Sequence, residues 1–361
     1  MLRSARTSCV ATATLLLAAI PAVAEQPTVQ LSIRGTLVSG TPVSWSDQLV
    51  YLLARDGMLW RFAPNDAQHF QQISTDFRPY SQSEMRGQLL SEFGRGYDVS
   101  GTGNYLVVHP AGQRDRWAPR FEELYRSFAH YFTARGLRPP RPSFPLVSIV
   151  FGSQEDLARY ASQQGGALQP GVLGYYSLVT NRVLLYDLTR GNQDDELWYV
   201  NAETIIHEAT HQIAFNCGIH SRFAPPPRWL GEGLAVMFES PGVWNSRHFP
   251  RLQDRVNKGR LQSFLQYQRN GRPKNSLAQF VSASDRLFDS NPQAAYAEAW
   301  ALSFFLAEKE PAKYVQYLSK TAGREPLHRY NSVEQLKEFT DVFGSNLQML
   351  EVRFLRFIEQ L

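Results

Sequence analysis

The chain has 361 residues, 43% of them hydrophobic, which suits one large globular domain or two to three smaller ones. The formal net charge is only +4, and no run of lysine or arginine forms the basic stripe typical of nucleic-acid binding. After the N-terminal region no segment reaches about 18 consecutive apolar residues, so we expect neither nucleic-acid binding nor stable membrane insertion.

Residues 1–24 have the pattern of a secretory signal peptide. Two arginines precede a short apolar stretch at residues 10–20, and small residues up to Ala24 offer a cleavage site. This pattern predicts an exported protein, periplasmic or secreted. Cleavage would also remove Cys9 and leave Cys217 alone, so no internal disulfide is expected.

The first part of the mature chain, residues 25–75, is predicted to be a small β module, because short β-rich runs alternate there with Gly, Asp and Pro. From about residue 84 the pattern changes. A helix is predicted up to Gly94, and a strand at residues 105–110. Pro119 is expected in the first turn of the next helix.

The following elements continue this alternation. Residues 144–151 read as a buried strand, and Ser153 as the start of a helix. Two strands on either side of Thr180 and Asn181 form a predicted hairpin, and from Arg251 onward the chain is mostly helical. We therefore predict an α+β protein with three parts after the signal.

The predicted parts are the β module, an α/β half at residues 76–245 and a helical lobe at residues 246–361. The segment NAETIIHEATHQIAF lies in the second part and carries His207, Glu208 and His211. Two histidines four residues apart lie on one face of a helix, so both imidazoles can converge on one metal ion.

The glutamate between the histidines has a role of its own in this interpretation. Glu208 borders the histidine face, where it can take a proton from a metal-activated water, as in the metalloproteases that carry this motif. Apolar residues occupy the opposite side of the helix and would face a core. The alternative is an ordinary surface helix with two solvated histidines.

A catalytic zinc site needs a third protein ligand and an open position. The next helical segment begins at Pro225–Pro227 and has Glu232 as its central acid. The extended motif that ends in a third histidine is not met, because Ala214 and Cys217 occupy its two defining positions. His220 and a Cys217 thiolate are the alternatives, although Cys217 fits better as a small buried hydrophobe.

The segments HEATHQ and WLGEGLAVMFE together resemble the gluzincin metallopeptidases, the class of thermolysin and aminopeptidase N. The resemblance implies a zincin-like mixed sheet with active-site helices and a helical C-terminal lobe. It also implies Zn2+ bound by His207, His211 and Glu232. Gly233 and Ala235 match the small residues that let the second helix pack against the histidine helix.

A third segment, YAEAWALSFFL, is similar to the tyrosine segment of aminopeptidase-like gluzincins. The resemblance implies that Tyr296 donates a hydrogen bond to the tetrahedral intermediate, although Tyr296 also fits a helical core stripe with Trp300 and Phe304. Over roughly residues 76–310, the order of elements further resembles an exported bacterial family of unknown function with a gluzincin-like domain.

Two departures from the gluzincin pattern bear on mechanism. Residues 171–177 lack the acid with which aminopeptidases hold the substrate amine, which favours an endopeptidase. Val236 stands where thermolysin-like sites place the acid that orients a zinc histidine. Glu239 and Glu203 are the remaining candidates for that role, and either one can equally be a solvated helix charge.

Gluzincin substrates usually add to an edge strand, and GYYSLV is the corresponding segment here. Tyr175 and Tyr176 would then flank the cleft, or else form a cross-strand aromatic pair. The sequence thus predicts an exported zinc peptidase for peptide or protein substrates, with Glu208 and Tyr296 as catalytic residues. The alternative is a non-catalytic zinc-containing envelope binding or assembly protein, and nothing in the sequence indicates an oligomeric state.

Overall fold

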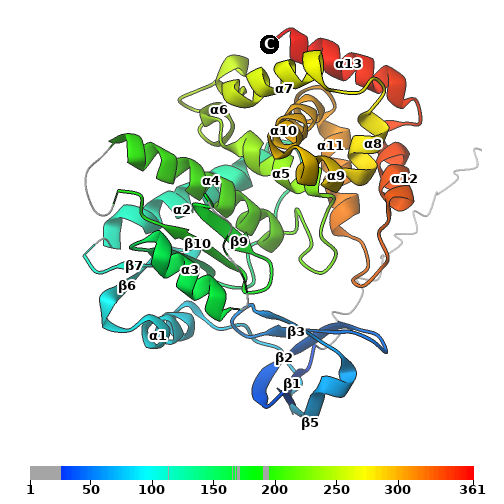
Figure 1. Ribbon diagram of the computed structural model, residues 1–361. Coiled ribbons are helices and arrows are strands. Elements are labelled where there is room, and N and C mark those ends of the chain that lie inside the picture. Colours follow the sequence, from blue (N-terminus) through cyan, green and yellow to red (C-terminus); the bar gives the residue numbers. More distant parts are fainter. Residues whose placement is uncertain (1–25, 113, 165, 167, 169–170, 190–194) are drawn as a thin grey trace, which may run out of the picture.

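The computed structural model describes residues 26–361 except residues 113, 165, 167, 169–170 and 190–194 (Figure 1). The predicted signal segment therefore lies outside the described residues. The α+β class is confirmed, with two five-stranded sheets and many helices. In the view of Figure 1 the N-terminal sheet lies at the lower end and the C-terminal helices at the upper end.

The first sheet is the predicted β module, and all of its strand pairs are antiparallel. Its spatial order is β4-β3-β2-β1-β5. The strands are β1 (Thr28–Ile33), β2 (Thr36–Trp45), β3 (Val50–Ala54), β4 (Leu59–Phe62) and β5 (Ala67–Ser74). A short 3-10 turn, η1 (Pro64–Asp66), precedes β5.

Hydrogen bonds attach this module to the rest of the chain. The backbone N–H of Leu59 in β4 donates to the carbonyl of Val179 at 2.8 Å, and that of Tyr80 donates to the carbonyl of Arg55 at 2.7 Å. The module therefore contacts the connection between β9 (Gly174–Ser177) and β10 (Arg182–Tyr186) of the second sheet.

The second sheet is mixed and has the order β6-β7-β8-β10-β9. β8 pairs parallel with both β7 and β10, whereas β6 and β9 are antiparallel edge strands. Besides β9 and β10, its strands are β6 (Tyr97–Gly101), β7 (Tyr105–Pro110) and β8 (Leu146–Phe151). The predicted strands at residues 105–110 and 144–151 and the hairpin at Asn181 are confirmed, and Asn181 adopts a positive φ of 60° in the turn.

Helices cover both faces of this sheet. α1 (Gln82–Phe93) and α3 (Gln154–Gln163) pack on one face through a core that includes Leu89 and Leu157. α2 (Arg114–Thr133) and α4 (Asp195–Asn216) share a second core with side chains of the other face. Alternate strand residues point to opposite faces, so β7 contributes Val107 to one core and Val108 to the other.

Helix α2 corrects one expected boundary. It begins at Arg114, so Pro119 lies inside the helix and not in its first turn. At this position the proline lacks the N–H that would bond to the carbonyl four residues earlier, and its ring crowds that carbonyl. The predicted end of α1 at Gly94 and the predicted start of α3 at Ser153 are confirmed. Ser153 accepts a hydrogen bond from the N–H of Asp156 at 3.2 Å.

The C-terminal half is helical, as predicted. Its elements are α5 (Arg228–Phe238), α6 (Pro241–Trp244), η3 (Leu252–Arg255), α7 (Lys258–Asn270), α8 (Leu277–Ala283), α9 (Asp285–Ser290), α10 (Pro292–Lys309), α11 (Pro311–Ala322), α12 (Ser332–Phe343) and α13 (Leu347–Glu359). A further 3-10 turn, η2 (Gly94–Gly96), follows α1. No helix in the described part of the chain is long and apolar enough to cross a membrane.

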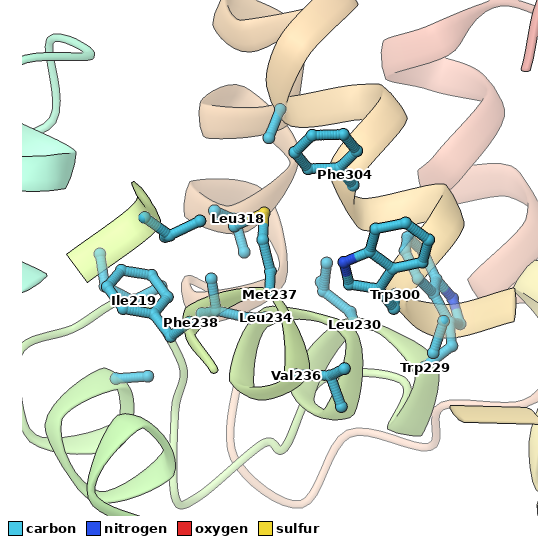
Figure 2. Close-up of a cluster of buried hydrophobic side chains, with 14 of the residues drawn as sticks. Ile219, Trp229, Leu230, Leu234, Val236, Met237, Phe238, Trp300, Phe304 and Leu318 are labelled. Atoms are coloured by element: carbon cyan, nitrogen blue, oxygen red, sulfur yellow. The ribbon is translucent and has the colours of Figure 1, made fainter. Parts of the chain in front are cut away.

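The C-terminal helices share one core with α2 and α4, so the predicted boundary near residue 245 does not separate two cores. Figure 2 shows the centre of this core, where Leu230 and Met237 of α5 meet Trp300 and Phe304 of α10 and Leu318 of α11. Helix α5 is therefore packed between the histidine helix and the C-terminal helices. Its exact position relative to its neighbours is fixed by packing on both sides.

Candidate metal centre

The histidine helix α4 is anchored to the second sheet by amide side chains. The buried Gln212 donates to the carbonyls of Val147 in β8 and Asn181, both at 2.9 Å. Asn216 donates to the side-chain oxygen of Asn181 at 2.7 Å and accepts a bond in return at 2.9 Å. The sheet thus fixes both the rotation and the height of α4, and hence the direction of His207 and His211.

Helix α5 brings Glu232 to the two histidines. Its position depends on Gly233, where a Cβ atom would lie 2.2 Å from the Ser303 hydroxyl and 2.4 Å from the Ala299 carbonyl. Both of those residues belong to α10. The expectation that Gly233 permits close packing against the histidine helix is therefore wrong, because its bare face meets α10 while Glu232, the preceding residue, faces α4.

The predicted ligand atoms converge. The Nε2 atoms of His207 and His211 lie 3.3 Å apart, and each lies 3.4 Å from Oε2 of Glu232. These three residues form the His/Cys/Asp/Glu group among the described residues whose ligand atoms lie close enough together to hold one metal ion. The structure therefore shows a possible metal-binding triad drawn from two different helices.

The shape of the triad fits a tetrahedral ion. Metal–ligand bonds of about 2.0–2.1 Å in tetrahedral geometry put neighbouring ligand atoms about 3.3–3.4 Å apart, which matches all three observed separations. Oε2 of Glu232 is also buried without a hydrogen-bond partner. A buried carboxylate oxygen without a partner is costly, and a bound cation would satisfy it. The histidine and glutamate side chains remain 13–19% exposed, so the triad is accessible from solvent.

A second carboxylate orients one of the histidines. Nδ1 of His207 lies 2.8 Å from Oε1 of Glu239, and Asn257 donates to Oε2 of Glu239 at 2.9 Å. An Nδ1–H bond to Glu239 leaves the lone pair on Nε2 of His207 directed at the triad. Of the two candidates for this role, the structure places Glu239 beside the histidine, two helical turns after Glu232.

The charges at the triad favour a bound cation. Burial lowers the pKa of His207, but the nearby carboxylates of Glu232 and Glu239 raise it, and the net result lies well above the ordinary value. Burial raises the pKa of Glu232, but the charge of His211 and the close approach of both Nε2 atoms hold it well below the ordinary value. Glu232 is thus held as an anion, and positive charge is stabilised beside it.

Glu208 lies next to the triad but is held by a strand. Its Oε2 accepts a hydrogen bond from the backbone N–H of Tyr176 in β9 at 2.8 Å. Burial raises the pKa of Glu208, and this effect outweighs the opposite effects of His207 and His211. A carboxylate with a raised pKa is a better proton acceptor near neutral pH than an ordinary glutamate.

Tyr296 of α10 is also at this site. Its ring centroid lies 6.4 Å from that of His207, and Phe288 contacts its ring edge-to-face at 5.1 Å. Burial raises its pKa to about 12, with the charge of Glu232 acting in the same direction. Its hydroxyl therefore keeps its proton at neutral pH and can donate a hydrogen bond.

The alternative third ligands lie elsewhere. Cys217 is buried in the core, and burial raises the pKa of its thiol to about 12, so it is a neutral small hydrophobe at neutral pH. His220 is buried against the ring of Phe215, and burial lowers its pKa to about 3. Neither residue belongs to the metal-binding group.

The positions of Tyr175 and Tyr176 on β9 differ from both interpretations of the sequence. Their partners across the β9–β10 pair are Leu184 and Val183, so they form no cross-strand aromatic pair. Tyr175 packs with the core under α1 and α3. Tyr176 faces α4, where its ring stacks on Phe215 at 5.8 Å. Consecutive strand residues point to opposite faces, so the two rings do not lie on the same side of the sheet.

The comparisons with known proteins place the site within one family region. A family model described as "Protein of unknown function (DUF1570)" matches residues 201–328. The chain is similar to that family over this region. No match was found among curated proteins. The matched region contains the triad, Glu208, Glu239 and Tyr296, whereas the sheet that supports them precedes it.

Two residues at this site had no signal in the sequence motifs. Asn257 lies in a loop that is far from the histidine helix in sequence. It caps α7, where it accepts a hydrogen bond from the N–H of Arg260 at 3.1 Å. Arg260 belongs to none of the sequence motifs. Its guanidinium lies over the Tyr296 ring, 5.2 Å from the centroid.

Proposed function

We propose that this protein is a zinc-dependent hydrolase of the gluzincin type that cleaves peptide bonds. The observation that carries the proposal is the triangle of His207, His211 and Glu232, whose ligand atoms have the spacing of a tetrahedral zinc site. Two imidazole nitrogens and one carboxylate oxygen are also a donor set that zinc accepts in catalytic sites, with the fourth position left for water or substrate.

Hydrolysis requires more than a metal-binding triad. A bound zinc ion would act as a Lewis acid and make water a better nucleophile near neutral pH. Glu208 is suited to accept a proton from the attacking water, because it lies beside the triad and has a raised pKa. The Tyr176 N–H holds that carboxylate in place.

Tyr296 is suited to stabilise the reaction's negative charge. Its protonated hydroxyl can donate a hydrogen bond to the oxygen that gains charge when the amide carbonyl is attacked. A site that only binds metal for structural reasons would need neither a base nor this donor. The neighbouring residues therefore support catalysis over a purely structural role.

Peptides or proteins are the proposed substrates, and the predicted signal at residues 1–24 supports action outside the cytoplasm. The missing acid at residues 171–177 favours internal bonds over removal of N-terminal residues. Since Tyr176 N–H is occupied by Glu208, that donor is not available to a substrate strand on β9 in this state.

The test combines metal content with hydrolysis. Residues 25–361 are purified, supplied with zinc and freed of excess, and zinc is measured by mass spectrometry. We expect about one zinc per chain, and chelator-sensitive cleavage in a broad peptide library. Glu232→Ala should lose most of the zinc, whereas Glu208→Gln should keep it and lower kcat by about 10³-fold, because proton transfer is lost.

Glu123→Gln is the matched control for the charge change, because Glu123 is exposed on α2. It should leave both zinc and cleavage unchanged. Absence of zinc in the wild type after loading would contradict the metal site. Full zinc with no chelator-sensitive cleavage would contradict the catalytic role and leave the metal-binding triad standing.

A further inference from the structure

Arg260 is a positively charged side chain at the site that the proposed hydrolysis does not use. It lies in the first turn of α7, with its guanidinium 5.2 Å from the ring centroid of Tyr296. That ring lies 6.4 Å from the ring of His207. The ring of Tyr296 therefore lies near both this guanidinium and a residue of the metal-binding triad.

The backbone position of Arg260 is fixed relative to that triad. Asn257 accepts a hydrogen bond from the N–H of Arg260 through Oδ1 and donates to Glu239 through Nδ2. Glu239 in turn contacts His207. One asparagine side chain thus connects the first turn of α7 to the histidine, so the guanidinium is presented from a rigid support.

The guanidinium is also available to bind a ligand. Among the described residues no carboxylate lies within ion-pair distance of Arg260. Its nitrogen atoms are not among the buried polar atoms that lack a partner, so they reach solvent. Arg228 provides the contrast. It lies over the ring of Phe288 at 4.3 Å but already pairs with Asp289 at 3.5 Å.

The surrounding charge favours an anionic ligand at Arg260 and disfavours one elsewhere at the site. Arg251 and Arg255 already pair with Asp254 and Glu308, whereas Lys258 and Arg260 in the first turn of α7 have no ion-pair partner among the described residues. Three carboxylates, those of Glu208, Glu232 and Glu239, lie around the histidines and would repel a substrate anion. A negatively charged group is therefore attracted to the Arg260 side of Tyr296.

We propose that Arg260 binds a carboxylate of the substrate, so that the enzyme prefers peptides with a negative charge near the scissile bond. This rests on the proposed peptidase function. A guanidinium binds a carboxylate through two parallel N–H···O bonds, which gives geometric selectivity as well as affinity. The carboxylate is either an acidic side chain or the C-terminus of a short peptide, since both present the same group.

The test compares matched peptides on the zinc-loaded enzyme. Cleaved sequences from the library are resynthesised with Glu or Gln beside the scissile bond, each with a free or an amidated C-terminus. We expect kcat/KM to be about tenfold higher for the charged member of one pair. A Glu-over-Gln preference identifies a side-chain carboxylate, and an acid-over-amide preference identifies the C-terminus.

The variants show whether Arg260 is responsible. Arg260→Ala should remove the preference, Arg260→Lys should retain part of it, and Arg260→Glu should favour Lys over Gln at the same position. Arg269→Ala removes the same charge from an exposed position on α7 and should keep the full preference. For each variant the ratio of kcat/KM between paired peptides is compared, so a uniform loss of activity does not mimic the expected result.

Three results would overturn the inference. The first is a wild type that cleaves peptides without charge preference. The second is a preference that persists in Arg260→Ala. The third is an equal loss for charged and neutral peptides, which would mean that Arg260 acts through Tyr296 and not on the substrate. Absence of zinc-dependent cleavage of any peptide would instead overturn the proposed function together with this inference.

Discussion

Two polar clusters involve helix α10, which contributes Tyr296 to the first and Glu298 to the second. The first is the metal-binding triad with Tyr296 beside it. The second is formed by Arg272, Glu298 and Glu351, which are all buried, and Arg272 pairs with Glu298 at 2.8 Å as well as with Glu351. The second cluster contains its own cation, Arg272, whereas the first brings together two imidazoles and the carboxylate of Glu232.

The difference separates a cluster whose ionic groups satisfy one another from a cluster that is open to a ligand. Buried ionic groups that satisfy one another contribute to structure and are not accessible to a ligand. The triad is partly exposed, has an orienting carboxylate behind it, and lies next to a proton acceptor and a proton donor. The comparison predicts that the two clusters respond differently to the same kinds of substitution.

The largest effect on stability is expected at the structural cluster. Arg272→Ala would leave Glu298 and Glu351 buried without a cation, and we expect the free energy of unfolding to fall by about 3–5 kcal/mol. Urea denaturation of the zinc-loaded protein would measure it. Arg269→Ala, three residues away and exposed, should change stability by less than about 0.5 kcal/mol. Equal stability of both variants would show that the cluster contributes little.

Metal removal should lower the stability of the folded protein through the metal-binding triad. Zinc at a thousand times its dissociation constant would stabilise the folded protein by about 4 kcal/mol, because the unfolded chain lacks the assembled triad. The shift in unfolding midpoint between zinc-loaded and chelator-treated protein should be present in Glu298→Gln and lost in Glu232→Ala. A zinc-dependent shift that survives in Glu232→Ala would place the ion elsewhere.

A smaller effect is expected at the residue that orients His207. Glu239→Ala should weaken zinc binding by about 10–100-fold, because His207 loses the hydrogen bond that fixes its ring and tautomer. Asn257→Ala should weaken it less, since Glu239 remains. Competition with a zinc-binding dye would measure both. Unchanged affinity in Glu239→Ala would mean that packing alone orients the imidazole.

A pH dependence of stability is also expected at the structural cluster. Burial raises the pKa of Glu298 to about 7 from an ordinary value of 4.5, even though Arg272 opposes the shift. The folded state therefore binds this proton more tightly than the unfolded state, and the stability it contributes is lost as pH rises from 4.5 through about 7. Denaturation of chelator-treated protein at pH 5 and pH 8 should show a smaller difference in Glu298→Gln than in the wild type.

Much of this organisation could be predicted from the sequence, because it depends on local spacing. The i, i+4 histidines define their own face of α4, and the strands around Asn181 carry a clear turn signal. The assignment of Glu232 needed more than spacing, because it required two helices to meet. The resemblance to gluzincins supplied that information, and the 3.4 Å separations support it.

Other features could not be predicted because they depend on how distant elements pack. Glu239 was one of two equal candidates until the position of α5 against α4 was known. Gly233 was assigned to the wrong neighbour, since a small residue shows that something approaches closely but not which helix does so. Arg260 and Asn257 reach the site only through the fold of the C-terminal helices.

The attachment of the β module has a consequence for any experiment that deletes it. Val179, which accepts the hydrogen bond from Leu59, lies in the turn that follows β9, and Tyr176 of β9 holds Glu208 through its backbone. The sheet of β1–β5 therefore braces, through Leu59, the strand that supports the proposed general base. If the truncated protein hydrolysed peptides more slowly, this result would not by itself identify the module as a targeting domain, because loss of the brace would disturb Glu208 even with a freely diffusing substrate.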